Sequence, residues 1–259
     1  MRLSFTPLIF TQDQSGNFYL IDKNSFEIVL ISPLGAEEKR TGGSGFGSSE
    51  FIDPAEILWR GNYLYILDRG SKSVKVFDRL LNFRGEQKLG NVFSASQISD
   101  PASLTVNSFG EIFITDRLSH TILAADQSFR ERTDVFFIEN MPGKKMRFPL
   151  KIISEKDHIA VRDSAGLFIF DRFLNYRTYI ELKKTESLAG ISGNFLFMIE
   201  QNTVILREIS QPALVHFSYP IPDMQNELLL SPVVINKRLM YIAGNSLTMI
   251  KTDTILNEQ

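Results

Sequence analysis

The 259-residue sequence contains no cysteine, which excludes disulfide bonds and thiolate metal sites. Its 3 histidines (His120, His158 and His216) occupy different positions within the repeats described below. A catalytic zinc site usually needs three protein ligands, so none is predicted, and no catalytic residue is identified. No apolar run approaches the ~18 residues of a membrane-spanning helix. We therefore expect no membrane insertion.

The chain also lacks an excess of charge of either sign. It has 28 basic and 30 acidic residues and a net charge of −2, so nucleic acid is not an expected partner. Hydrophobic residues make up 43% and charged residues 22%, as in an ordinary soluble globular protein. The compartment stays unknown: cytoplasmic as the chain stands, or periplasmic or secreted if a native leader has been removed.

A repeated segment dominates the sequence. Each copy has a glycine or polar pair, an alternating apolar run ending in aspartate, a polar turn and a second alternating run. Clear copies span residues 16–32, 61–78 and 110–126, and weaker ones span 157–171, 193–208 and 237–253. The segment 77–83 also reappears as 170–176, in phase with these copies. Such periodicity indicates a repeat architecture.

Each unit is predicted to contain four antiparallel strands. An apolar run that often begins with proline precedes each glycine, and a more polar strand follows the second run. Units of about 43 residues with four strands are the size of a propeller blade. The prediction is an all-β, six-bladed β-propeller forming a single domain over residues 1–259. The units lie near residues 7–53, 54–100, 101–148, 149–184, 185–228 and 229–259, with residues 1–6 as the strand that closes the last blade.

Residues 42–54 and 61–78 resemble the NHL repeat family. A glycine-rich lead-in precedes Phe51-Ile52-Asp53-Pro54, and residues 61–68 and 74–78 are similar to the two strand motifs of the family. The resemblance implies a six-bladed propeller. Related propellers include binding modules, RNA-binding domains and metal-dependent hydrolases or lyases, so the resemblance does not determine the function.

The repeated aspartates are interpreted as structural turn residues. Each stands at the end of a strand before a polar turn, where its carboxylate can accept backbone N–H groups. These residues are Asp22, Asp68, Asp116 and Asp163. A ring of catalytic carboxylates is the alternative interpretation.

Three basic residues directly follow the first three of these aspartates. Repeat equivalence places Lys23, Arg69 and Arg117 on one face of three adjacent blades, as a tentative anion-binding arc. The alternative is that each forms a solvated ion pair of little consequence.

We expect a monomeric, non-enzymatic scaffold that binds a protein or peptide, possibly an acidic one, through this face. The alternatives are a propeller hydrolase or lyase with a metal in its central channel, and an RNA-binding NHL domain. No cofactor is predicted. Calcium bound by carbonyl and carboxylate oxygens in the channel needs no motif and stays open.

Overall fold

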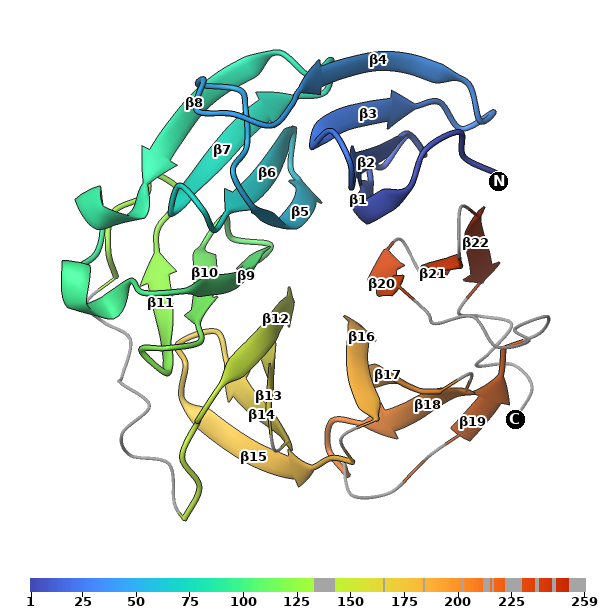
Figure 1. The fold of residues 1–259 in the computed structure, drawn as a ribbon. Coiled ribbons are helices and arrows are strands. Elements are labelled where there is room, and N and C mark those ends of the chain that lie inside the picture. The colour runs from blue at the N-terminus through green and yellow to red at the C-terminus, as the bar shows by residue number, and fades with distance from the viewer. Residues whose placement is uncertain are drawn as a thin grey trace.

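The computed structural model describes residues 1–132, 143–164, 166–183, 185–201, 203–211, 215, 217–221, 230–235, 238–243 and 246–251. Within these ranges the strands form six antiparallel sheets, each made of consecutive strands. The sheets stand around a central opening like the blades of a propeller (Figure 1). The predicted all-β propeller fold is therefore confirmed.

Four of the described sheets have four strands and two have three. The four-stranded sheets are β1 (Pro7–Gln12), β2 (Phe18–Asp22), β3 (Glu27–Ile31), β4 (Glu37–Gly42); β5 (Pro54–Arg60), β6 (Tyr63–Asp68), β7 (Ser73–Asp78), β8 (Phe83–Lys88); β12 (Pro149–Glu155), β13 (His158–Asp163), β14 (Gly166–Asp171), β15 (Tyr176–Glu181); and β16 (Glu186–Ser192), β17 (Phe195–Glu200), β18 (Thr203–Glu208), β19 (Phe217–Pro220). The three-stranded sheets are β9 (Pro101–Val106), β10 (Ile112–Asp116), β11 (Thr121–Ala125); and β20 (Leu230–Ile235), β21 (Arg238–Ala243), β22 (Ser246–Lys251).

These two sheets differ from the predicted four strands per blade. Next to β11 the described residues show only an isolated bridge between Ala125 and Glu131. The chain that continues from there, residues 133–142, lies outside the described residues, as do residues 252–259 after β22.

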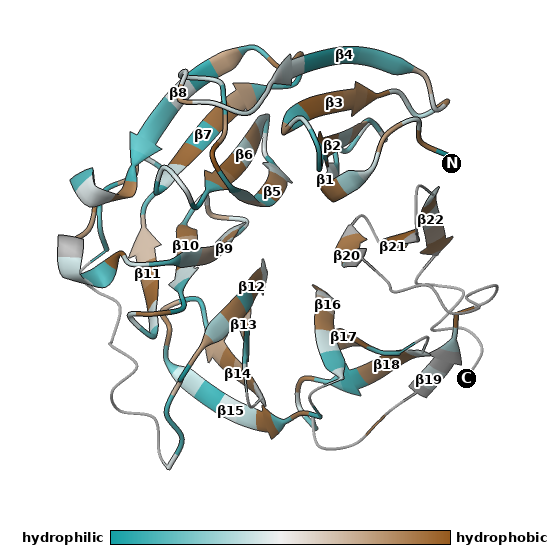
Figure 2. Cartoon of the chain, viewed as in Figure 1, coloured by the Kyte–Doolittle hydropathy of each residue, from teal (hydrophilic) through white to brown (hydrophobic). Residues whose placement is uncertain are grey.

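The hydrophobic core lies between neighbouring sheets. In β2 all five residues are buried, because both faces of the sheet are covered. Tyr19 and Ile21 of β2 share one buried cluster with Ile57, Leu64 and Ile66 of the next sheet. The outermost strands β4, β8 and β15 are partly exposed and more polar (Figure 2). This gradient explains why alternation is clear in the middle strands and weak in the outer ones.

The inner strands of four sheets begin with a proline: Pro7, Pro54, Pro101 and Pro149. A register shift follows each proline, as between Pro54 and Glu56. Proline fits the first position of a strand, and the shift marks a β-bulge or irregularity directly after it. The inner strands of neighbouring sheets lie side by side around the channel.

The N-terminal segment contacts the last described sheet. Arg2 forms an antiparallel bridge with Ser246, and the Leu247 N–H donates to the Met1 carbonyl at 2.8 Å. The pairing is shorter than the predicted closing strand over residues 1–6. Leu3 and Phe5 are buried in a cluster with Val29, Met240 and Ile242, among others.

Helical structure in the described residues is limited to two 3₁₀ turns, Leu89–Asn91 and Ala95–Gln97. In the same residues, no helix has the length and apolar character needed to cross a bilayer.

Candidate functional site in the central channel

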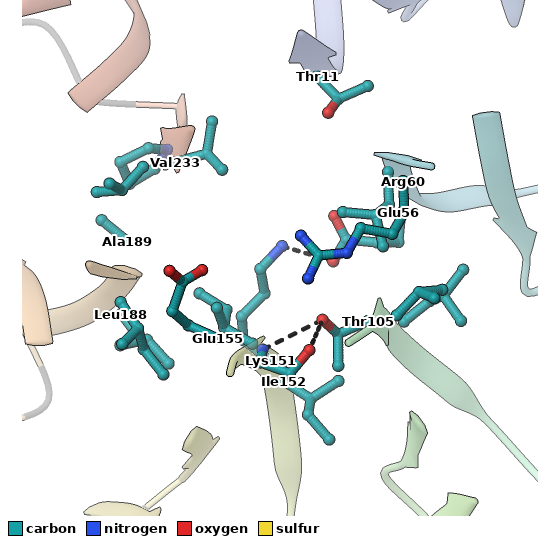
Figure 3. A pocket seen from close by; sticks show the side chains of 18 of the residues that line it. Thr11, Glu56, Arg60, Thr105, Lys151, Ile152, Glu155, Leu188, Ala189 and Val233 are labelled. Atoms are coloured by element: carbon teal, nitrogen blue, oxygen red, sulfur yellow. Dashed lines mark hydrogen bonds and ion pairs between the residues drawn. The ribbon is translucent and has the colours of Figure 1, made fainter. Parts of the chain in front are cut away.

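The central channel contains a cavity of about 1170 Å³, lined by residues of β1, β5, β9, β12, β16 and β20. Its wall is largely apolar, with Leu58, Leu104 and Ile153 among its residues. A few charged side chains interrupt this wall, and Figure 3 shows Arg60, Lys151 and Glu155 among them. A concave, mostly apolar cavity with a few polar groups is the usual form of a small-molecule site.

One charged group in this cavity is an ion pair between two different sheets. The Lys151 Nζ atom lies 2.5 Å from Glu56 Oε2 (Figure 3). The hydroxyl of Ser103, on the strand between them, donates to the same oxygen at 2.7 Å. That hydroxyl in turn accepts the N–H of Ile152 at 3.2 Å. The side chain of Glu56 is 11% exposed and that of Lys151 is 33% exposed, so a buried carboxylate holds an ammonium group at the cavity wall.

Two further charges occupy the other end of the same strands. Arg60 ends β5 and Glu155 ends β12, and both side chains point into the cavity (Figure 3). The Arg60 Nε donates to the Asn107 carbonyl at 3.2 Å. No ion pair or other hydrogen bond of these two side chains is found within the described residues. Both side chains are partly exposed in the cavity.

A third charged group includes Glu186, the first residue of β16. Glu186 accepts from Arg207 at 2.9 Å and from the Lys183 N–H at 2.8 Å. Arg162 donates to the carbonyls of Glu186 and Gly166 at 3.2 and 3.3 Å. Burial lowers the pKa of Arg162 from its usual value, although Asp163 and Glu186 oppose this. With these hydrogen bonds in place, the group serves to join two sheets.

Hydroxyl side chains also join neighbouring inner strands. The Thr105 and Ser154 hydroxyls are 2.9 Å apart, and the Ser154 N–H donates to Thr105 at 3.2 Å. The Trp59 N–H donates to the Thr11 hydroxyl at 3.2 Å. These bonds fix the positions of adjacent inner strands, and with them the charged side chains of the cavity.

The repeated aspartates lie at the turn between the second and third strand of their sheets, away from the cavity lining. Asp68 accepts the N–H groups of Ile52 and Asp53, which precede its own inner strand. Asp116 does the same for Ser99 and Asp100, and Asp163 for Arg147 and Phe148. Asp22 accepts the N–H of Asn24 at 2.9 Å. Their carboxylates thus hold turns and the connections between sheets.

The three basic residues of the predicted arc differ in their surroundings. Arg69 makes two hydrogen bonds to Asp53, and Arg117 makes two to Asp100. Lys23 is exposed, and its N–H donates to the Thr6 carbonyl. Because two of the three charges are already neutralised, the arc has less charge to offer an anion than the sequence suggested. Anion binding there stays a prediction.

Potential metal ligands do not gather in the part of the chain that the structure describes: no group of three or more His, Cys, Asp or Glu residues lies together there. His120 lies at the turn before β11 and His158 begins β13, and neither lines the cavity. His216 lies outside the described residues. A calcium ion in the channel stays a prediction.

Sequence reasoning missed Glu56, Arg60, Lys151 and Glu155. Glu56 and Lys151 are 95 residues apart, and they come together because their strands both pack against β9. The available signal was a charge inside an apolar inner strand, two residues after the entry proline in both Pro54–Arg60 and Pro149–Glu155.

No protein-family model matches this sequence, and no curated protein sequence is similar to it. Solved structures are similar in fold. Catalytically inactive virginiamycin B lyase from Staphylococcus aureus with Quinupristin has a TM-score of 0.66 at 13% identity, over 97% of this chain and 87% of that chain. BamB from Moraxella catarrhalis has a TM-score of 0.54 at 13% identity, over 92% of this chain and 70% of that chain. A nidogen/laminin complex has a TM-score of 0.62 at 13% identity, over 83% of this chain and 80% of that chain. At these identities the likeness shows a β-propeller fold.

The predicted non-enzymatic scaffold that acts through one face is wrong. It is contradicted by the lyases among the similar structures. The prediction depended on the absence of clustered titratable residues in the sequence. The fold instead brings Glu56, Lys151 and Glu155 to one cavity, because the inner strands of separate sheets converge there.

Proposed function

We propose that the chain is an enzyme whose active site is the central channel, and that Lys151 transfers a proton to a small bound substrate. The observation that carries this proposal is the contact between Lys151, Glu56 and Ser103 at the wall of the cavity. A positioned side chain that donates or accepts a proton in the transition state contributes about 10²–10⁴-fold to a reaction rate.

The contact suits Lys151 to act as a general acid. Glu56 fixes the ammonium group, and Ser103 and the Ile152 N–H keep the carboxylate and hydroxyl in place. The ammonium can donate one proton to the leaving atom as its bond to the substrate carbon breaks. A water molecule forms the new bond to that carbon, and the proton that this water releases returns to the Lys151 amine. Arg60, in the same cavity, adds positive charge that stabilises a developing anion.

The comparisons support an enzyme without identifying its reaction. Virginiamycin B lyase and streptogramin B lyase have the same fold over 97% of this chain. No histidine of the described residues lines the channel of this chain, and we assign proton transfer to Lys151 because Glu56 and Ser103 hold it in place.

The test is a turnover screen with a panel of linear and cyclic esters, read with a pH-indicator dye because hydrolysis of an ester releases an acid. We expect turnover of at least one member, with a loss of about 100-fold or more in Lys151→Met and Glu56→Gln. Glu38→Gln, an exposed change in β4, is the control. Thermal melts establish that each variant is folded. Turnover that persists in Lys151→Met, or no turnover across the panel, contradicts the proposal.

We also propose that the six described sheets are the complete set of blades in one NHL-like domain. The phase of the sequence repeats supports this, as does the contact of Arg2 with Ser246 between the first and last described segments. A single calorimetric unfolding transition is expected, since blades that share cores unfold together. Two separate transitions would contradict a single domain.

A further inference from the structure

Two strands of the channel carry opposite charges in opposite order. On β5, Glu56 precedes Arg60 by four residues, and on β12, Lys151 precedes Glu155 by four residues. Four residues of strand span about 13 Å, so each strand presents one charge near each end of the cavity. One end of the cavity thus holds Glu56 with Lys151, and the other holds Arg60 with Glu155.

Glu56 and Lys151 form an ion pair at one end of the cavity, whereas Arg60 and Glu155 at the other end do not. Lys151 reaches past β9 to Glu56, and Ser103 of β9 joins them. At the other end, the Asn107 carbonyl after β9 accepts from Arg60 Nε, and no ion pair joins Arg60 to Glu155 within the described residues. Glu155 then keeps its carboxylate without an ion pair within the described residues. Both side chains are only partly exposed.

Separated charges of opposite sign in a partly desolvated cavity favour a ligand that supplies both counter-charges. The Nη atoms of Arg60 present the planar fork that binds a carboxylate through two hydrogen bonds. The Glu155 carboxylate accepts from an ammonium group. The wall near them includes apolar side chains, Val106 and Ile153 among them. An anion alone would satisfy only Arg60, and a cation alone only Glu155.

We propose that Arg60 and Glu155 bind the two charged ends of a small zwitterion, an amino acid or short peptide with apolar side chains. This assignment rests on the proposed function, because it places the ligand in the same cavity as Lys151, and it names the substrate class of that site. Lys151 then lies toward the other end of the bound molecule, where the reaction takes place.

The test is isothermal titration calorimetry with three probes of nearly equal size: leucyl-leucine, N-acetyl-leucyl-leucine without the ammonium group, and leucyl-leucinamide without the carboxylate. We expect leucyl-leucine to bind at least 10-fold more tightly than either capped probe. Arg60→Met is expected to remove the preference over the amide, and Glu155→Gln the preference over the acetylated probe. Glu38→Gln, which removes an exposed charge in β4 outside the cavity, is the control and is expected to keep both preferences.

Equal affinity for the three probes, no binding of any probe, or preferences that survive both cavity variants would overturn the assignment. Lys151→Met separates it from the proposed function. If this variant binds leucyl-leucine with full selectivity and the wild type turns nothing over, the zwitterion site stands and the enzymatic proposal fails. If turnover depends on Lys151 but the probes bind equally, the enzyme stands and the substrate class is wrong.

Discussion

Arg117 and Asp100 form a two-point ion pair, with Nε to Oδ2 at 2.7 Å and Nη2 to Oδ1 at 2.8 Å. Asp100 is the residue before Pro101, the first residue of β9. Arg69 holds Asp53 before Pro54 in the same way, at 2.6 and 3.1 Å. The basic residue after each of these repeated aspartates therefore fixes the place where the chain enters a channel strand.

The two ion pairs are expected to differ in their effect on stability. Asp53 is 45% exposed and Asp100 is 19% exposed, so solvent screens the first pair more. Arg69→Met should lower the free energy of unfolding by at most about 1 kcal/mol, as is usual for exposed pairs. Arg117→Met should cost more, about 1–3 kcal/mol, because it removes two hydrogen bonds from a less exposed carboxylate and leaves it only Arg69, whose Nε lies 4.0 Å away. Urea unfolding measures both, and equal losses would contradict the ranking.

The N-terminal segment is expected to stabilise the ring through its buried side chains. Phe5 is 8% exposed and packs with residues of the first and last described sheets. Phe5→Ala should lower the free energy of unfolding by about 3–5 kcal/mol, the range for large aromatic side chains in a core. Leu34→Ala, at a side chain that is 96% exposed, is the control and should change it by less than about 0.5 kcal/mol. A loss at Phe5 no larger than at Leu34 would show that the segment does not hold the ring.

The turn at Asp78 predicts a dependence of stability on pH. Burial would raise the pKa of Asp78, but hydrogen bonds from Asn82, Leu80 and Arg84 outweigh it and lower the pKa to about 2. An unfolded aspartate has a pKa near ~3.9. Since the folded value is the lower one, this stabilisation is fully present above about pH 5 and is lost as the pH falls toward 2.

Asp78→Asn should therefore cost about 0.5–1 kcal/mol at pH 7, the scale of an ion pair with the exposed Arg84. The difference in stability between the variant and the wild type should become smaller as the pH falls to about 2. Thermal melts across this range measure it. If the difference in melting temperature between Asp78→Asn and the wild type is the same at pH 7 and at pH 2, the charge of Asp78 has no role in stability.

Contact between inner strands leaves no room for a side chain at Gly190 in β16. A β-carbon there would lie 2.5 Å from Cβ and 3.1 Å from the backbone N of Val234 in β20. Gly190→Ala should cost about 1–3 kcal/mol through overpacking. In Gly85→Ala, on the outer strand β8, the added carbon meets nothing within 4 Å and should change stability by less than about 0.5 kcal/mol. Similar urea midpoints for the two variants would refute this contact.

The β-propeller fold could be predicted from the sequence because strand alternation, entry prolines and turn residues are local. Alternation reports which face of a strand is buried, and Pro54 and Pro101 mark strand starts without reference to the rest of the chain. Asp68 and Asp116 could likewise be placed at turns, since an aspartate after a strand bonds to nearby backbone. Asp68 and Asp116 also accept the N–H groups of Asp53 and Asp100, which precede the inner strands of the same sheets. These hydrogen bonds form as soon as the first and second strands of a sheet pair.

The candidate site could not be predicted because its parts meet only when the sheets close around an axis. Glu56 and Lys151 stand 95 residues apart, and although each is a charge inside an apolar inner strand, nothing local shows that these two side chains meet. The placement of Arg60 and Glu155 in one cavity, and the close approach of Gly190 to Val234, could not be predicted from the sequence either. Tertiary structure decided these relationships, because the distance between inner strands is set by the packing of the sheets against one another, a property of the whole ring.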